Sequence, residues 1–253
     1  MYFLVKVLSI PHISFSTADW EKFANDADTY WASGVYVRMD ASISVTSSVG
    51  TSSNPYKGNF DGNWNTLTLE FKESVDCLAP FSYVESSTIK NLTVTGNIKS
   101  DGSYIGGLIG CTKKGTTTVT SCTSSVTINY EKISDKNGQG YYGGFVGHII
   151  GESSQVEFKY CIFNGTISGE NLDCAGFVGS IENKGYAKYE YCTMAYGKIS
   201  IPSGFYTFHH NNGGKYESND SYYTKKGVEE EDIGQGGTQA SESASGKNVI
   251  DKI

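Results

Sequence analysis

Arginine is almost absent from this chain. Arg38 is the only arginine among 253 residues, and the formal net charge is −7. Proteins that bind DNA or RNA concentrate Arg and Lys on one face, where these side chains neutralise phosphates. The composition therefore argues against a nucleic acid, or any strongly anionic polymer, as the ligand.

Long apolar runs are missing too, so the sequence predicts no membrane span. Residues 1–10 are apolar, but no basic residue precedes the apolar run and no cleavage site of small residues follows it. They therefore make a poor signal peptide, and we expect an N-terminal strand there.

Motifs that bind metals or cofactors are also missing. No two cysteines have Cys-x-x-Cys spacing, and no histidine belongs to a His-Glu-x-x-His motif. We expect a turn or surface role for the histidines, and the adjacent pair would face opposite sides of a strand. The four histidines are His12, His148, His209 and His210. The sequence predicts no metal site, no cofactor and no catalytic residue.

What the chain does contain favours strands and tight turns. It has 30 Gly, 18 Tyr and 12 Phe but 4 Pro, and Val, Ile, Thr, Tyr and Phe are the prominent residues of its repeated segments. Residues 17–27 are the exception, because their apolar side chains recur with helical spacing: Trp20, Phe23, Ala24 and Ala27. We expect this helix to cover the first open end of the strands that follow.

A five-residue block recurs along the middle of the chain. Its clear copies are Gly-Gly-Leu-Ile-Gly, Gly-Gly-Phe-Val-Gly and Ala-Gly-Phe-Val-Gly, and Ser-Gly-Phe-Tyr-Thr is a weaker fourth. The second residue marks each copy: Gly107, Gly144, Gly176 and Gly204. These markers lie 37, 32 and 28 residues apart, which indicates insertions at the turns of a repeated structure.

A four-residue signature follows each clear block, and a similar one precedes the first. Its last position holds Leu92, Cys122, Cys161 and Cys192 in turn. An apolar residue stands three positions earlier, and a straight strand would point the two to opposite faces. Both can point inward only if the chain bends between them, so each copy predicts a strand, a corner and a short strand. Because a metal site would not accept Leu92, we interpret this column as an internal stack of small apolar side chains.

These repeats predict a mainly β fold. We expect a right-handed parallel β-solenoid, or β-helix, of about five coils with an N-terminal capping helix. Residues 1–75 would hold an N-terminal strand, the capping helix and the first strands, and residues 76–224 the repeats. Residues 225–253 are rich in Gly, Ser, Glu and Gln and predict a flexible tail or linker. The sequence leaves open whether the remaining cysteines form a disulfide: Cys77, Cys111 and Cys174.

The recurring block resembles the Gly-Leu-x-Gly-like motif of GLUG-repeat proteins. The chain carries it at 107–110, 144–147 and 176–179, and the cysteine column matches the Cys that commonly follows. Residues 56–67 resemble the lead-in of that family, although Trp-Asn replaces its usual Gly-His. The resemblance covers residues 17 to about 224.

The resemblance has implications for where the protein acts. GLUG repeats occur in bacterial adhesins, in surface lipoproteins and beside the protease domain of immunoglobulin-A-cleaving metallopeptidases. It therefore implies an extracellular or cell-surface location, and it supplies no active site that could be transferred to this chain.

Tyrosine supplies the candidate ligand contacts. A stacked array could present an exposed aromatic ladder suited to sugar rings or to a protein partner, although tyrosine also stacks well as an ordinary strand residue. The candidates are Tyr141, Tyr142, Tyr186, Tyr196 and Tyr206.

Three functions remain open at this point. The first is a non-catalytic cell-surface or secreted module for adhesion that binds a glycan or a host protein. The second is a carbohydrate-active enzyme on a β-helix, a polysaccharide lyase or a glycosidase; a glycosidase would need two carboxylates about 5 to 9 Å apart. The acidic candidates all lie in turn-like contexts: Asp61, Asp76, Asp101 and Asp173. The third is a passive spacer in a larger surface protein.

Overall fold

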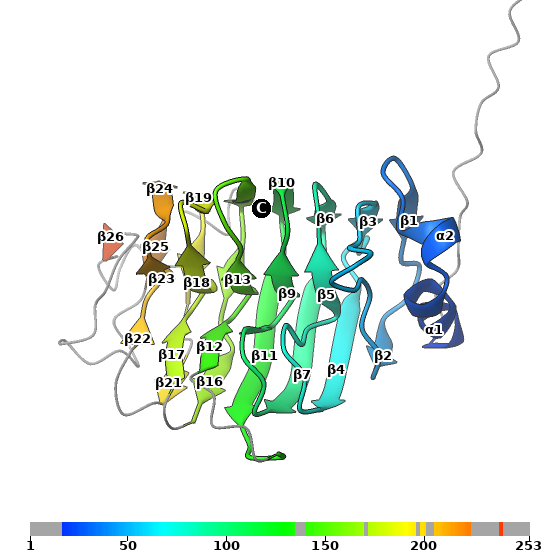
Figure 1. The fold of residues 1–253 in the computed structure, drawn as a ribbon, viewed down its shortest axis with the longest axis horizontal. Coiled ribbons are helices and arrows are strands. Elements are labelled where there is room, and N and C mark those ends of the chain that lie inside the picture. The colour runs from blue at the N-terminus through cyan, green and yellow to red at the C-terminus, as the bar shows by residue number, and fades with distance from the viewer. Residues whose placement is uncertain are drawn as a thin grey trace, which may run out of the picture.

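The computed structural model describes residues 17–134, 140–169, 172–195, 198–200, 205–223 and 238–239. The strand expected at 1–10 and most of the tail expected at 225–253 lie outside these residues. Figure 1 shows the described chain as a row of strands that runs from two short helices at one end to β24 and β25 near the other.

The fold is mainly β, and its strands form four parallel sheets. The first sheet contains, in order, β1 (Tyr36–Arg38), β3 (Asn59–Asp61), β6 (Thr88–Lys90), β10 (Gly115–Thr120), β14 (Ser154–Lys159), β19 (Tyr186–Glu190) and β24 (Lys215–Asn219). The second contains β2 (Ile43–Val45), β4 (Thr66–Lys72), β7 (Thr93–Ser100), β11 (Thr123–Tyr130), β15 (Ile162–Phe163), β16 (Thr166–Ser168), β20 (Thr193–Met194), β21 (Lys198–Ser200), β25 (Tyr222–Tyr223) and β26 (Thr238–Gln239).

The other two sheets are smaller. The third contains β8 (Ile105–Gly106), β12 (Gly140–Gly143), β17 (Leu172–Ala175) and β22 (Phe205–Tyr206). The fourth contains β5 (Phe81–Val84), β9 (Ile109–Thr112), β13 (Val146–Ile149), β18 (Val178–Glu182) and β23 (His209–Asn212). The chain visits the four sheets in a fixed order, for example β10, β11, β12 and β13, before it returns to the first. We call each such round a pass.

Each corner between the first and second sheets is built as the signature predicts. Val119, Phe158 and Tyr189 lie in register on neighbouring strands of the first sheet and are buried. One residue before each cysteine of the column has positive φ, for example 54° at Tyr160 and 53° at Tyr191. This left-handed residue costs about 1–2 kcal/mol, but it turns the chain so that both flanking side chains face inward.

The column of small residues is buried, which confirms the predicted internal stack. Leu92, Cys122, Cys161 and Cys192 are at most 1% exposed, and the three cysteines are free thiols. The Sγ atom of Cys161 lies 3.4 Å from the carbonyl oxygen of Val119 on the preceding pass. The thiols therefore fill space between passes and act as small apolar side chains.

The corner between the third and fourth sheets explains the five-residue block. A Cβ atom on Gly144 would lie 2.2 Å from the carbonyl oxygen of Gly176, and one on Gly107 would lie 2.1 Å from that of Gly144. No side chain fits at these positions, because the backbone of the next pass occupies the space. The close approach of neighbouring backbones therefore requires glycine at these marker positions.

Aromatic rings fill the core beside this corner. Phe145, Phe177 and Phe208 belong to consecutive passes and stack with centroid separations of 4.9 and 4.8 Å. All three are fully buried, and we call them the inner phenylalanine row. Ring stacking of this kind adds about 0.5–1.5 kcal/mol per pair to the apolar burial.

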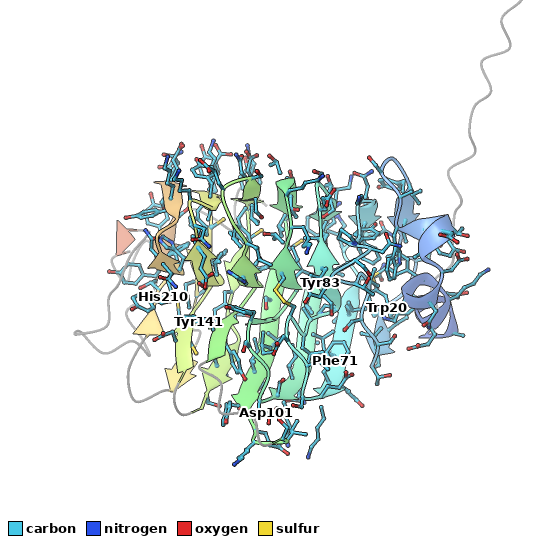
Figure 2. The ribbon with its side chains drawn as sticks, in the orientation of Figure 1. Trp20, Phe71, Tyr83, Asp101, Tyr141 and His210 are labelled. Atoms are coloured by element: carbon cyan, nitrogen blue, oxygen red, sulfur yellow. A yellow bond between two sulfur atoms is a disulfide. The ribbon has the colours of Figure 1, made fainter. Side chains whose placement is uncertain are left out.

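Two helices lie at the N-terminal end of the described chain. Helix α1 (Thr17–Asn25) ends two residues before the predicted boundary, and Asp26 then accepts a hydrogen bond from the Thr29 amide to begin α2 (Ala27–Tyr30). Trp20 is fully buried and packs edge-on against Phe60 and Phe81. Figures 1 and 2 show α1, with Trp20, at the end of the row beside β2, where the capping helix was expected. Neither helix of the described ranges has the length and apolar character that a bilayer span requires.

Candidate functional site

The structure separates the five candidate tyrosines. Tyr142 is fully buried, and its hydroxyl donates a 2.9 Å hydrogen bond to the Ser100 carbonyl, so its proposed role as a ligand contact was wrong. Side chains alternate between the two faces of a strand, and on β12 Tyr142 points inward whereas Tyr141 points outward. Tyr196 lies outside the described residues.

Tyr186 lies on the first sheet, away from the third-sheet strands of Tyr141 and Tyr206. Its hydroxyl donates a 2.9 Å hydrogen bond to Glu217 on the neighbouring strand. Burial and this carboxylate raise the pKa of Tyr186 to about 12. Its contact with Glu217 joins two strands of the first sheet.

Tyr141 and Tyr206 do come together, in a row of stacked rings outside the core. Tyr141 stacks on Tyr104 at 5.5 Å and on His210 at 5.6 Å, with interplanar angles of 10° in both pairs. His210 also stacks on Tyr206 at 4.6 Å, and Tyr104 stacks on His148 at 4.0 Å. We call these five residues the aromatic strip. Figure 2 shows Tyr141 and His210 beside one another in this region.

The strip follows the corner between the third and fourth sheets. Tyr104, Tyr141 and Tyr206 come from the third-sheet side, and His148 and His210 come from β13 and β23 of the fourth sheet. A Cβ atom on Gly147 would lie 2.2 Å from the carbonyl oxygen of Tyr104. The last glycine of the block therefore brings the two sheets close enough for their side chains to stack.

The histidines of the strip are only partly accessible. His148 is buried, and its Nε2 lies 3.2 Å from a carboxylate oxygen of Glu182. Burial lowers the pKa of His148, although Glu182 opposes that effect. Burial also lowers the pKa of half-buried His210, against the attraction of Asp173 and Glu182. Burial therefore favours the neutral form of both imidazoles.

The expectation of a surface or turn role fails for His148 and His209. His209 is fully buried on β23, where it stacks on Tyr189 at 5.7 Å. Burial and the neighbouring His210 lower the pKa of His209 to about 4. The two adjacent histidines face opposite sides of the strand, as alternation requires, but one of those sides is the core.

Carboxylates surround the aromatic strip. Asp173 and Glu182 lie close enough to Tyr141 to help burial raise the pKa of its hydroxyl. Burial also raises the pKa of Tyr104, and Glu182 and Asp76 add to this effect. The described residues contain no group of three or more His, Cys, Asp or Glu side chains that could hold a metal ion.

The other two acidic candidates have structural partners. Asp61 accepts hydrogen bonds from the Tyr36 hydroxyl at 2.5 Å and from the Asn91 amide at 3.0 Å. Asp101 is buried and accepts a 2.8 Å hydrogen bond from the Ile133 amide. Both carboxylates join neighbouring passes.

A disulfide lies at the corner between the third and fourth sheets, on the same side as the aromatic strip. Cys77 and Cys111 are bonded, with their Cα atoms 5.3 Å apart. Cys111 is in register with His148 on the next strand of the fourth sheet, so it occupies the preceding position in that column. The disulfide joins the pass of β5 to the pass of β9.

Sequence reasoning missed three members of the strip: Tyr104, His148 and His210. The block offered a signal for one of them, because Tyr104 lies three residues before the marker Gly107, as the candidate Tyr141 lies three before Gly144. Equal offsets from equivalent glycines place the two tyrosines on the same face of neighbouring strands. No comparable offset relates His210 to His148, because the register between β18 and β23 shifts at a bulge.

No family model matches the chain, and no curated protein matches it in sequence. Among solved structures, the chain is similar to a protein named as a putative immunoglobulin A1 protease from Bacteroides ovatus, known at 1.30 Å resolution. The TM-score is 0.51 and the sequence identity is 15%, over 93% of this chain and 81% of that one. At this identity the similarity concerns the fold alone.

Proposed function

We propose that this chain is a non-catalytic module for adhesion and that the aromatic strip is its binding surface. The observation that carries the proposal is a row of five stacked rings whose tyrosines and His210 remain partly exposed. Aromatic side chains supply large contact area with little loss of conformational entropy, and Tyr is enriched at binding interfaces. The ligand is a glycan or a protein of the host surface.

The scaffold we propose is a right-handed parallel β-solenoid of about five coils. The parallel pairing of every pass with the next supports it. So does the resemblance of the repeated block to GLUG-repeat surface proteins. Such a scaffold would hold the strip rigidly, which lowers the entropic cost of binding.

We also propose an extracellular or cell-surface location. The Cys77–Cys111 disulfide supports it, since structural disulfides persist in oxidising compartments. An intracellular chain would keep these thiols reduced.

Binding by the purified chain to arrays of host glycans and of extracellular matrix proteins tests the proposal. The double variant Tyr141→Ser and Tyr206→Ser should remove at least about 90% of the bound signal, since hot-spot aromatics each contribute about 2 kcal/mol or more.

A matched control exists on the opposite corner. Tyr160 and Tyr191 also stack, at 5.2 Å, but outside the strip. The variant Tyr160→Ser and Tyr191→Ser should retain binding. Equal losses in the two double variants would contradict the assignment of the strip, and an absence of binding on both arrays would leave the passive spacer as the better account.

One observation favours the enzyme alternative. Asp173 and Glu182 both influence Tyr141 and His210, so two carboxylates lie beside one aromatic surface. A carbohydrate-active enzyme would release reducing ends from polysaccharides and lose that activity in Asp173→Asn. For a module that only binds, we expect no release.

A further inference from the structure

Carboxylates lie beside the aromatic strip in the part of the chain that the structure describes. Asp173 is in register with Tyr141 on the neighbouring strand β17, and a carboxylate oxygen of Glu182 lies 3.2 Å from Nε2 of His148. Both carboxylates also influence the pKa of Tyr141 and of His210. Asp76 extends the negative field to Tyr104 and to Tyr83 on β5. Lys113 lies 5.8 Å from the ring centre of Tyr83, which is outside the aromatic strip.

The faces of the central ring are already covered. Tyr141 has Tyr104 on the side of the preceding pass and His210 on the side of the following passes. A sugar ring stacks on a free aromatic face, so the middle of the strip offers it little. What Tyr141 presents outward is its edge, where the carboxylates add negative charge.

His148 supplies a second, independent observation. Its side chain is 6% exposed, yet neither Nδ1 nor Nε2 has a hydrogen-bond partner among the described residues. A buried polar atom without a partner costs about 1–3 kcal/mol. A neutral imidazole Nδ1 that carries no proton accepts a hydrogen bond, so a ligand donor would remove this cost.

We propose that the aromatic strip binds a basic segment of a protein partner, in which Lys or Arg side chains lie along the tyrosine edges between Asp173 and Glu182. This inference rests on the proposed function and names its ligand class. Ammonium and guanidinium groups carry several N–H donors and a positive charge, which complement carboxylates, phenol oxygens and an unpartnered imidazole nitrogen. Acidic glycans meet repulsion at the same place.

Titration with a synthetic peptide tests the proposal. The probe is a fluorescent Gly-Arg-Gly-Lys repeat of twelve residues, and its controls are the same peptide with Gln in place of Arg and Lys, a neutral oligosaccharide and a sialylated oligosaccharide. We expect the basic peptide to bind best and its affinity to fall as salt is raised.

Charge-neutral variants locate the binding. The double variant Asp173→Asn and Glu182→Gln should weaken the basic peptide about tenfold or more, which corresponds to 1.4 kcal/mol. Glu190→Gln is the matched control, because Glu190 pairs with Lys159 on the first sheet, outside the strip. It should change the affinity less than twofold, whereas an equal effect would mean attraction by net charge alone and would overturn the inference.

The outcomes separate this inference from the proposed function. If a neutral or sialylated oligosaccharide binds the strip and the basic peptide does not, the ligand class is wrong but adhesion through the strip stands. If the basic peptide binds and Tyr141→Ser with Tyr206→Ser does not weaken it, the strip itself is wrong. Circular dichroism of each variant excludes unfolding as the cause.

Discussion

The molecule contains two rows of stacked rings that differ in their access to solvent. The inner phenylalanine row, Phe145, Phe177 and Phe208, is fully buried beside the corner glycines. The aromatic strip lies on the other side of the same corner and keeps Tyr141 partly exposed. The comparison teaches that stacking between passes follows from the fold, whereas exposure and surrounding charge distinguish a surface that can bind.

The largest expected effect comes from breaking the inner row. Phe177→Ala removes a ring that stacks on both Phe145 and Phe208, and it leaves a cavity in a closely packed core. We expect the free energy of unfolding to fall by about 3–5 kcal/mol. Urea denaturation measures it, and a loss below about 1 kcal/mol would show that the row collapses around the gap.

The disulfide at the corner should come next. Cys77→Ala with Cys111→Ala opens a link across 34 residues, and we expect a loss of about 2–4 kcal/mol in unfolding free energy. The array signal of this variant should survive at a temperature where it remains folded, since neither cysteine belongs to the aromatic strip. Loss of binding in a folded variant would show that the disulfide positions the strip.

The buried His209 makes the stability of the fold depend on pH. The folded-state pKa of His209 is about 4, below the ordinary value of 6.5, so the unfolded chain binds more protons between these values. The stabilisation is therefore complete above about pH 6.5 and is lost as the pH falls towards 4, by about 3 kcal/mol in total.

The variant His209→Phe keeps a ring on Tyr189 and removes the titrating group. Its unfolding free energy should depend less on pH between 6.5 and 4 than that of the parent chain, measured by urea denaturation at several pH values. Equal slopes would mean that other groups carry the acid sensitivity.

The smallest effect on stability is expected in the aromatic strip. Tyr141→Ala removes a partly exposed ring and should lower the unfolding free energy by about 1 kcal/mol or less, although it should weaken ligand binding strongly. Thermal denaturation and array binding of the same sample compare the two effects. A stability loss as large as that of Phe177→Ala would mean that the strip is part of the core.

The repeats made much of the fold predictable. The apolar residue three positions before each of Cys122, Cys161 and Cys192 required a bend, and the structure has a left-handed residue directly before each cysteine. The sequence could not separate Tyr141 from Tyr142, and both were named as candidate ligand contacts. Two adjacent tyrosines on a short strand carry no signal for which one faces inward. The flanking residues, Gly140 and Gly143, have no side chains from which the alternation of inward and outward positions could be inferred.

The site was less predictable for a related reason. Its members come from separate passes and from both sides of a corner, as Tyr104 and His148 do, so no local pattern joins them. The Cys77–Cys111 pairing also depends on which passes lie next to each other. Such contacts follow from the register, which the variable spacing of the marker glycines conceals.

The parallel pairing of every pass with the next has a mechanical consequence. The backbone hydrogen bonds between passes point along the row of strands in Figure 1, so a force that pulls the two ends of the row apart loads them one pass after another. We expect the chain to peel from its C-terminal end at low force. Peeling would stop at the Cys77–Cys111 bond, which ties two passes covalently and would leave the helix-capped end folded under tension.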